Sequence, residues 1–129
     1  MSLQPGSLGE DALSFLREYH LASLTTSRAD GSPHVVPVGF SYDDATRTVR
    51  IITFASSQKY RNALRGGRAA VSQVDGGRWL TLEGTVSGTD DPARVALAVD
   101  GYAARYRQPG ERADRVAVEI AVDRIMGRA

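Results

Sequence analysis

The sequence predicts a mainly β domain, a barrel or sandwich accompanied by helices. About six segments alternate apolar and polar residues with the period of two that is typical of strands. Turn signals at residues 29–31 (ADG) and 75–77 (DGG) separate consecutive segments, which favours antiparallel hairpins. The chain does not alternate strands with helices, and it has neither a GxGxxG motif nor a P-loop, so a doubly wound nucleotide-binding sheet is not indicated.

The first half of the chain contains a helix and three strands. Residues 10–19 have the spacing of a short helix. Strands are expected over 20–28, 33–42 and 47–54, because β-branched and aromatic residues alternate there between two faces. Pro37 lies inside the second of these strands, which indicates an edge, a bulge or a point where the chain leaves the sheet.

The second half begins with a change of period. Residues 56–65 are expected to form a short helix, with Ser56 or Ser57 as its N-cap and Gly66-Gly67 at its end. The remaining elements are strands over 68–74 and 78–88, one long helix over 90–107 and a last strand over 115–123.

The length of 129 residues fits one domain. We expect this domain over residues 10–129. Residues 1–9 are rich in Gly, Pro and Ser, and we expect them to be disordered or foreign to the natural chain.

Composition narrows the function classes. The net charge is +1, from 16 basic and 15 acidic residues, so no basic footprint for nucleic acid or for an anionic membrane is present. The absence of cysteine excludes disulfides and thiolate catalysis, and it fits a reducing cytoplasm, where we expect the protein. No apolar run reaches the roughly 20 residues of a membrane span, so no membrane segment is expected.

No classical catalytic constellation is present in the sequence. His20 and His34 are its only histidines and have no metal-binding spacing, so we expect no metal site and interpret His34 as a half-exposed strand residue. A nucleophile elbow is missing. Glu83, on the strand face of Trp79, is interpreted as the partner of an arginine rather than as a general acid. No residue is assigned as catalytic.

The segment 56–65 is the one place with a chemical signal. It puts hydroxyls, an arginine, an asparagine and Lys59, the only lysine, at the start of a short helix that follows a buried strand. Free N–H groups and the helix dipole attract an anion at such a position. The alternative from the local pattern is an ordinary capped surface helix.

Four segments in this order resemble the pyridoxamine-phosphate-oxidase-like flavin and deazaflavin oxidoreductases. They are residues 20–26 (HLASLTT), 30–38 (DGSPHVVPV), 57–62 (SQKYRN) and 79–84 (WLTLEG). The resemblance covers roughly residues 10–126. Residues 72–80 (SQVDGGRWL) and the pair Tyr106-Arg107 are similar to the short actinobacterial branch of coenzyme F420-dependent biliverdin reductases.

The resemblance implies a six-stranded split β-barrel of the flavin-binding type and a role for each matching segment. The cofactor phosphate would be held by Ser57, Gln58, Lys59, Arg61 and Asn62. The ring pocket would be lined by Pro37, Val38, Gly39, Thr53 and Phe54. In the homodimer that the family forms, with the cofactor near the interface, the partner subunit would contribute Arg78 and Trp79.

The implied function is a reductase that transfers a hydride from reduced coenzyme F420 to a conjugated organic acceptor, such as biliverdin. Two alternatives stay open: an oxidase or reductase of the same fold that binds FMN, and a carrier of cofactor or tetrapyrrole without catalysis. Carboxylates of a small-molecule substrate would suit arginines near the mouth of the pocket, for which the candidates are Arg78, Arg105 and Arg107.

Overall fold

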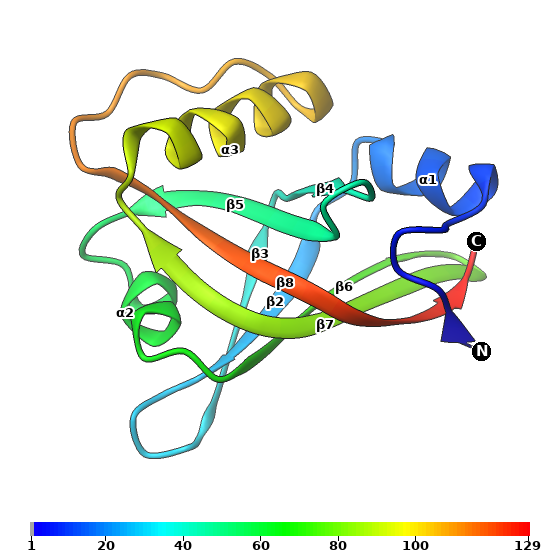
Figure 1. Cartoon of the computed structure of the whole chain (residues 1–129), viewed down its shortest axis with the longest axis horizontal. Helices are drawn as coiled ribbons and strands as arrows, with labels where there is room; N and C mark the ends of the chain where they lie inside the picture. Colours follow the sequence, from blue (N-terminus) through cyan, green and yellow to red (C-terminus); the bar gives the residue numbers. More distant parts are fainter. Residues whose placement is uncertain (1) are drawn as a thin grey trace.

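One antiparallel sheet and three helices make up the chain in a computed structural model that describes residues 2–129 (Figure 1). In chain order the elements are β1 (Ser2–Leu3), α1 (Glu10–Arg17), β2 (Ala22–Ser27), β3 (Pro33–Val38), β4 (Ser41–Asp43), β5 (Thr48–Phe54), α2 (Gln58–Leu64), β6 (Arg68–Asp75), β7 (Arg78–Thr89), α3 (Pro92–Arg105) and β8 (Arg115–Arg128). The mainly β prediction is confirmed, and each predicted helix is present.

The strands are hydrogen-bonded in the order β3-β2-β6-β7-β8-β5-β4, and β1 pairs with β8. The two end strands of this path, β3 and β4, are consecutive in the chain and are separated only by Gly39 and Phe40. The sheet must therefore curve until its edges approach each other. It closes through the covalent chain at these two residues, without a ladder of hydrogen bonds between β3 and β4.

The prediction of one strand over 33–42 was wrong because of this break. Phe40 leaves the ladder, and side chains of α3 and its C-cap take over its backbone groups. Its carbonyl accepts a hydrogen bond from Arg105 Nη1 at 2.9 Å, and its N–H donates to Tyr106 Oη at 3.2 Å. The count of six strands was too low for the same reason, and because β1 adds to the sheet.

Residues 2–9 differ from the expectation of disorder. β1 pairs with the end of β8, and Leu8 is buried in the core. The backbone N–H groups of Gly6 and Leu8 donate to the carboxylate of Asp44 at 2.9 and 3.2 Å. This segment is therefore packed against the domain.

The core lies inside the curved sheet and follows the predicted alternation. Val49, Ile51, Leu80, Leu82 and Ile120 are buried, as the period of two requires. The long helix departs from the sequence-based expectation that Val95, Val99, Tyr102 and Tyr106 form its buried stripe. These four residues are only half-buried, and Ala98 is the one buried residue of α3. In residues 2–129, no helix has the length and apolarity to cross a membrane.

Candidate functional site

A cavity of about 390 Å³ lies where the end of β3, β5, the start of α2 and the α3–β8 connection meet. We call it the Lys59 cavity. It brings together four of the residues predicted to bind the cofactor: Pro37, Val38, Gly39 and Lys59. The other lining residues include two aliphatic side chains of β5 and three side chains from the last third of the chain: Ile51, Ile52, Tyr102, Arg107 and Arg115.

A smaller hollow of about 220 Å³ adjoins the Lys59 cavity. Thr53 and Phe54, both predicted pocket residues, line it, and it shares Lys59 and Arg115 with the larger cavity. The Phe54 ring is covered by the guanidinium of Arg112, whose Cζ lies 4.3 Å from the ring centroid. The predicted residues of β3 and β5, together with Lys59 of α2, thus line two neighbouring hollows.

Lys59 is half-buried at this region, and its amine makes no hydrogen bond or ion pair within residues 2–129. Burial lowers the pKa of the amine, because a charged group is less stable away from water. A partly desolvated cation with no carboxylate beside it is a strong attractor for an anionic ligand.

The other side chains predicted to hold the phosphate are engaged within the chain. Ser57 Oγ is the N-cap of α2: it accepts from Tyr60 N–H at 3.3 Å and from Thr53 Oγ1 at 2.9 Å. Asn62 is buried and donates to Thr26 Oγ1 at 2.9 Å. These two residues therefore shape the start of α2.

Gln58 and Arg61 form a pair on the surface of the same helix. Arg61 Nη1 donates to the Ser56 carbonyl at 2.5 Å, and Nη2 donates to Gln58 Oε1 at 2.7 Å. Gln58 Nε2 donates in turn to Asn62 Oδ1 at 2.7 Å. Of the five side chains predicted in this segment, only that of Lys59 lines the cavity without a partner in the described part of the chain.

Gly39 has a steric reason to be glycine. A Cβ at this position would lie 2.9 Å from a ring carbon of Tyr102 and 3.0 Å from one of Tyr106. These two rings lie against each other, with centroids 4.9 Å apart and planes tilted by 40°. Tyr106 is fully engaged, because its hydroxyl donates to the His20 carbonyl at 2.7 Å. Tyr102 lines the Lys59 cavity, and its hydroxyl has no hydrogen-bond partner within residues 2–129.

The sequence did not point to Tyr102 or Arg115 as site residues. Tyr102 was assigned to the buried stripe of the long helix, and Arg115 is only the first residue of the last strand. Arg115 reaches the cavity because β8 pairs with β5 in a register that sets it opposite Phe54. Nothing in the local sequence signals that register.

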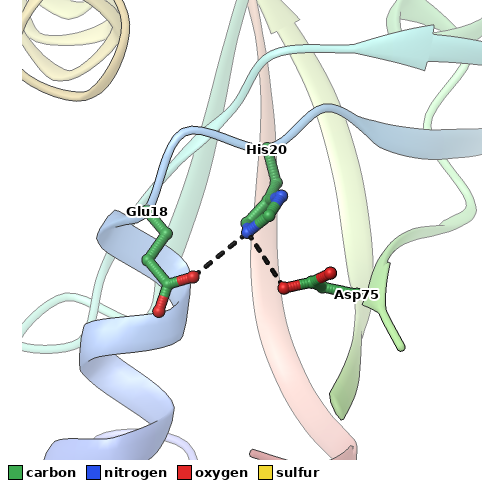
Figure 2. A group of neighbouring side chains, drawn as sticks. All are labelled: Glu18, His20 and Asp75. Carbon is green, nitrogen blue, oxygen red and sulfur yellow. Dashed lines mark hydrogen bonds and ion pairs between the residues drawn. The ribbon is translucent and has the colours of Figure 1, made fainter. Parts of the chain in front are cut away.

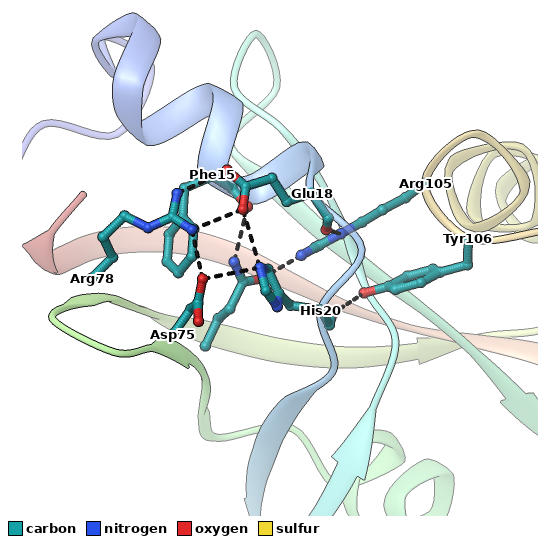
Figure 3. A network of polar contacts seen from close by, with 8 residues as sticks. Phe15, Glu18, His20, Asp75, Arg78, Arg105 and Tyr106 are labelled. Carbon is teal, nitrogen blue, oxygen red and sulfur yellow. Dashed lines mark hydrogen bonds and ion pairs between the residues drawn. The ribbon is translucent and has the colours of Figure 1, made fainter.

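Arg78 and Trp79 do not line the cavity. They are the first two residues of β7, which begins at the β6–β7 hairpin, at the end of the sheet near α1 and remote from α2 (Figure 1). The guanidinium of Arg78 binds both oxygens of Glu18 at 2.8 and 2.9 Å and Asp75 Oδ2 at 2.6 Å (Figure 3). It also lies over the Phe15 ring. Arg78 is therefore occupied within its own chain, and Trp79 points to the opposite sheet face, beside Val74.

Glu18, His20 and Asp75 face one another closely enough to resemble a metal-binding group (Figure 2). His20 Nε2 lies 3.1 Å from Glu18 Oε1 and 3.6 Å from Asp75 Oδ2. Arg78, however, already supplies the positive charge (Figure 3). Its hydrogen bonds, with that of His20, lower the pKa of Glu18 to about 2. The group is an ion-pair network.

Arg105, a predicted substrate contact, is part of the scaffold. Its guanidinium donates to the Glu18 carbonyl at 2.8 Å (Figure 3), to the Phe40 carbonyl at 2.9 Å and to Gln73 Oε1. All three groups are neutral acceptors, so Arg105 fastens α3 to the closing point of the sheet. It does not line the Lys59 cavity.

His34, interpreted as a plain strand residue, is half-buried, and its Nδ1 atom has no hydrogen-bond partner in the described residues. Burial, with the charges of Arg28 and Lys59, lowers its pKa. It does not line the Lys59 cavity.

The family comparison covers nearly the whole chain. The sequence model of the family described as pyridoxamine 5'-phosphate oxidase matches residues 8–128. An F420H(2)-dependent biliverdin reductase from Mycobacterium tuberculosis (strain CDC 1551 / Oshkosh) is 52% identical over 122 residues, which are 95% of this chain and 89% of that protein.

Solved structures share the fold. A conserved hypothetical protein from Mycobacterium tuberculosis superimposes with a TM-score of 0.79 at 22% identity, covering 99% of this chain and 89% of that one. A structure described as an F420 reductase gives a TM-score of 0.69 at 28% identity, covering 93% of this chain and 98% of that one.

Proposed function

This chain belongs to the pyridoxamine 5'-phosphate oxidase family, and from that premise we propose that it is a coenzyme F420-dependent reductase. It would transfer a hydride to a conjugated organic acceptor, with biliverdin as the leading candidate. The identity of 52% to a reductase named for both molecules supports this assignment. The observation on the molecule that carries it is the amine of Lys59, which has no partner within residues 2–129, at a cavity whose wall includes aliphatic side chains.

The residues present fit such a cofactor. A deazaflavin is a flat tricyclic ring joined to a phosphate. Pro37, Val38 and Ile52 offer the apolar surface that a flat ring needs, and Lys59 offers a positive charge to the phosphate. When bound, the reduced deazaflavin supplies a hydride.

The chain's own part in the reaction is positioning and exclusion of water. Lys59 would fix the phosphate, and the walls of β3 and β5 would hold the ring plane. Gly39 keeps the backbone close to Tyr102, which leaves the phenol at the cavity wall. The titratable side chains of the Lys59 cavity are those of Lys59, Tyr102, Arg107 and Arg115, and the proton for the acceptor would come from solvent or from a water held by an arginine.

We further propose a split barrel of the flavin-binding type that works as a homodimer in the cytoplasm. The outer face of β3 and β6 carries the exposed apolar side chains of Val35 (57% exposed) and Val74 (67% exposed). Val74 pairs across the ladder with Trp79, so the three share one sheet face. A two-fold contact through this face would cover them. Light scattering that gives a monomer at micromolar concentration would refute this part.

The test of the function begins with binding. Purified protein is titrated with coenzyme F420 by fluorescence, and reoxidation of the reduced cofactor is then followed with biliverdin beside a quinone and a nitro compound. We expect saturable binding and turnover of biliverdin. Absence of F420 binding would refute the proposal; a yellow protein carrying FMN would favour the FMN alternative, and binding without turnover of any acceptor would favour a carrier.

A further inference from the structure

The Lys59 cavity holds more positive charge than one phosphate requires. Lys59, Arg107 and Arg115 all line it, and no aspartate or glutamate does. Neither arginine makes a side-chain hydrogen bond or an ion pair within residues 2–129, whereas Arg78, Arg94 and Arg105 are engaged. The phosphodiester of F420 carries a single negative charge. If Lys59 binds it, Arg107 and Arg115 are left for another anion.

The two arginines come from a different part of the fold than the lysine. Lys59 is on α2 and also lines the hollow beside Phe54. Arg107 follows α3, and Arg115 opens β8, so they border the side of the cavity formed by the α3–β8 connection. This arrangement gives the cavity one cation at its α2 side and a pair at its α3 side.

Arg115 also connects the cavity to a groove of about 740 Å³ along α3, whose apolar floor includes Val95 and Val99. Asp90, Asp100 and Glu111 border the same groove. Because these carboxylates repel a second anion, the arginines at the cavity end are the favourable place for a carboxylate. The apolar floor beyond them suits the flat body of a conjugated molecule.

We propose that Arg107 and Arg115 form a second anion site that binds a carboxylate, apart from the phosphate held by Lys59. This rests on the proposed function. The carboxylate has two sources: a propionate arm of the acceptor, or the glutamate tail of the cofactor. Arginine suits either, because its planar donors match both oxygens of a carboxylate.

The test compares Arg115→Gln and Arg107→Gln with the wild-type chain and with Arg17→Gln. Arg17 is a matched control because it pairs only with Glu10 at the exposed surface of α1. One arm titrates cofactor-free protein with biliverdin and with biliverdin dimethyl ester by absorbance. The other measures the Kd of F420 and of the deazaflavin mononucleotide, which keeps the phosphate and lacks the tail.

If the acceptor is the source, Arg115→Gln weakens biliverdin binding at least about tenfold and leaves the dimethyl ester unchanged. If the cofactor tail is the source, the same variant weakens F420 by a similar factor and leaves the mononucleotide unchanged. Either result supports the second anion site. A variant that weakens the mononucleotide as much as F420, or that changes none of the four affinities, overturns it. The wild-type titration with F420 reports separately on the proposed function.

Discussion

Replacement of Lys59 with glutamine separates binding from folding. The variant keeps the length and the aliphatic stem of the side chain and removes its charge. Because the amine has no partner within residues 2–129, its removal leaves no acidic group unpaired in the chain. The effect on cofactor affinity is therefore the loss of one charge-assisted hydrogen bond, about 1.5–3 kcal/mol. This corresponds to a Kd for F420 that is raised about 10- to 150-fold.

The stability of the cofactor-free protein should move the other way, or not at all. Burial lowers the pKa of Lys59 in the folded chain, so the folded state holds this proton less tightly than the unfolded state. The charged amine then costs folding free energy at neutral pH, and the cost fades as the pH rises through the folded pKa. Glutamine removes the cost, so the free energy of unfolding should be unchanged or slightly higher.

The assay is a fluorescence titration with F420 alongside urea unfolding of the same preparations. Arg61→Gln is the control, because Arg61 was also predicted to hold the phosphate but is bound to the Ser56 carbonyl and Gln58. We expect it to change the Kd less than about threefold, the effect of a surface charge. The reasoning would be refuted if Arg61→Gln weakened F420 as much as Lys59→Gln, or if Lys59→Gln lost affinity only through unfolding.

Three further predictions follow from contacts described above. Tyr106→Phe removes two hydrogen bonds at the closing point of the sheet and should lower the free energy of unfolding, measured in urea, by about 1–3 kcal/mol. Tyr102→Phe is the control and should change it by less than about 0.5 kcal/mol. Equal losses in the two variants would contradict the structural role given to Tyr106. Gly39→Ala should destabilise by about 1–3 kcal/mol through overlap with both tyrosine rings, while Gly110→Ala, where a Cβ meets nothing within 4 Å, serves as the control in the same unfolding series. The ionised carboxylate of Glu18 stabilises the fold above its ordinary pKa of 4.5, and this stability is lost as the pH falls toward 2. In Glu18→Gln the free energy of unfolding should therefore fall less steeply with pH over that range. A pH dependence equal to that of the wild-type chain would disprove this prediction.

The strands were predictable because burial of one sheet face produces a local alternation of apolar and polar residues in the sequence. Val49, Ile51, Leu80 and Leu82 alternate with polar neighbours, and the structure buries each of them. The break at Phe40 is signalled only indirectly, by Pro37, which indicated an edge, a bulge or a point of departure but not its position. It exists because residues of α3 and its C-cap, more than sixty positions away, take over its backbone hydrogen bonds. A periodicity argument cannot foresee a partner at that separation.

The candidate site divided in the same way. Ser57, one of the two serines expected to cap α2, is its N-cap. Because its hydroxyl already accepts hydrogen bonds from Tyr60 N–H and Thr53 Oγ1, it has less capacity to bind a phosphate than the motif implied. Lys59, its neighbour two residues on, points into a cavity. Whether Ser57 or Lys59 can bind a ligand depends on the hydrogen bond from Thr53 and on the α3–β8 connection, which lines the cavity. Both lie outside the segment 56–65, so its sequence cannot reveal them.

Two residues of the same type therefore have different roles, according to whether their polar atoms are already hydrogen-bonded within the fold. Arg105 binds three acceptors and fastens α3, whereas Arg115 binds none within residues 2–129 and lines the cavity. The two tyrosines differ in the same respect, although their rings lie against each other: the hydroxyl of Tyr106 is hydrogen-bonded, whereas that of Tyr102 has no partner within residues 2–129. In each pair, the member whose polar atoms are satisfied belongs to the scaffold, and the member without a side-chain partner among residues 2–129 is half-buried and lines the cavity. A ligand in this cavity would meet the side chains of Lys59, Tyr102 and Arg115, whose polar atoms bind nothing else in the described residues. This is the physical reason to treat the cavity as the binding site.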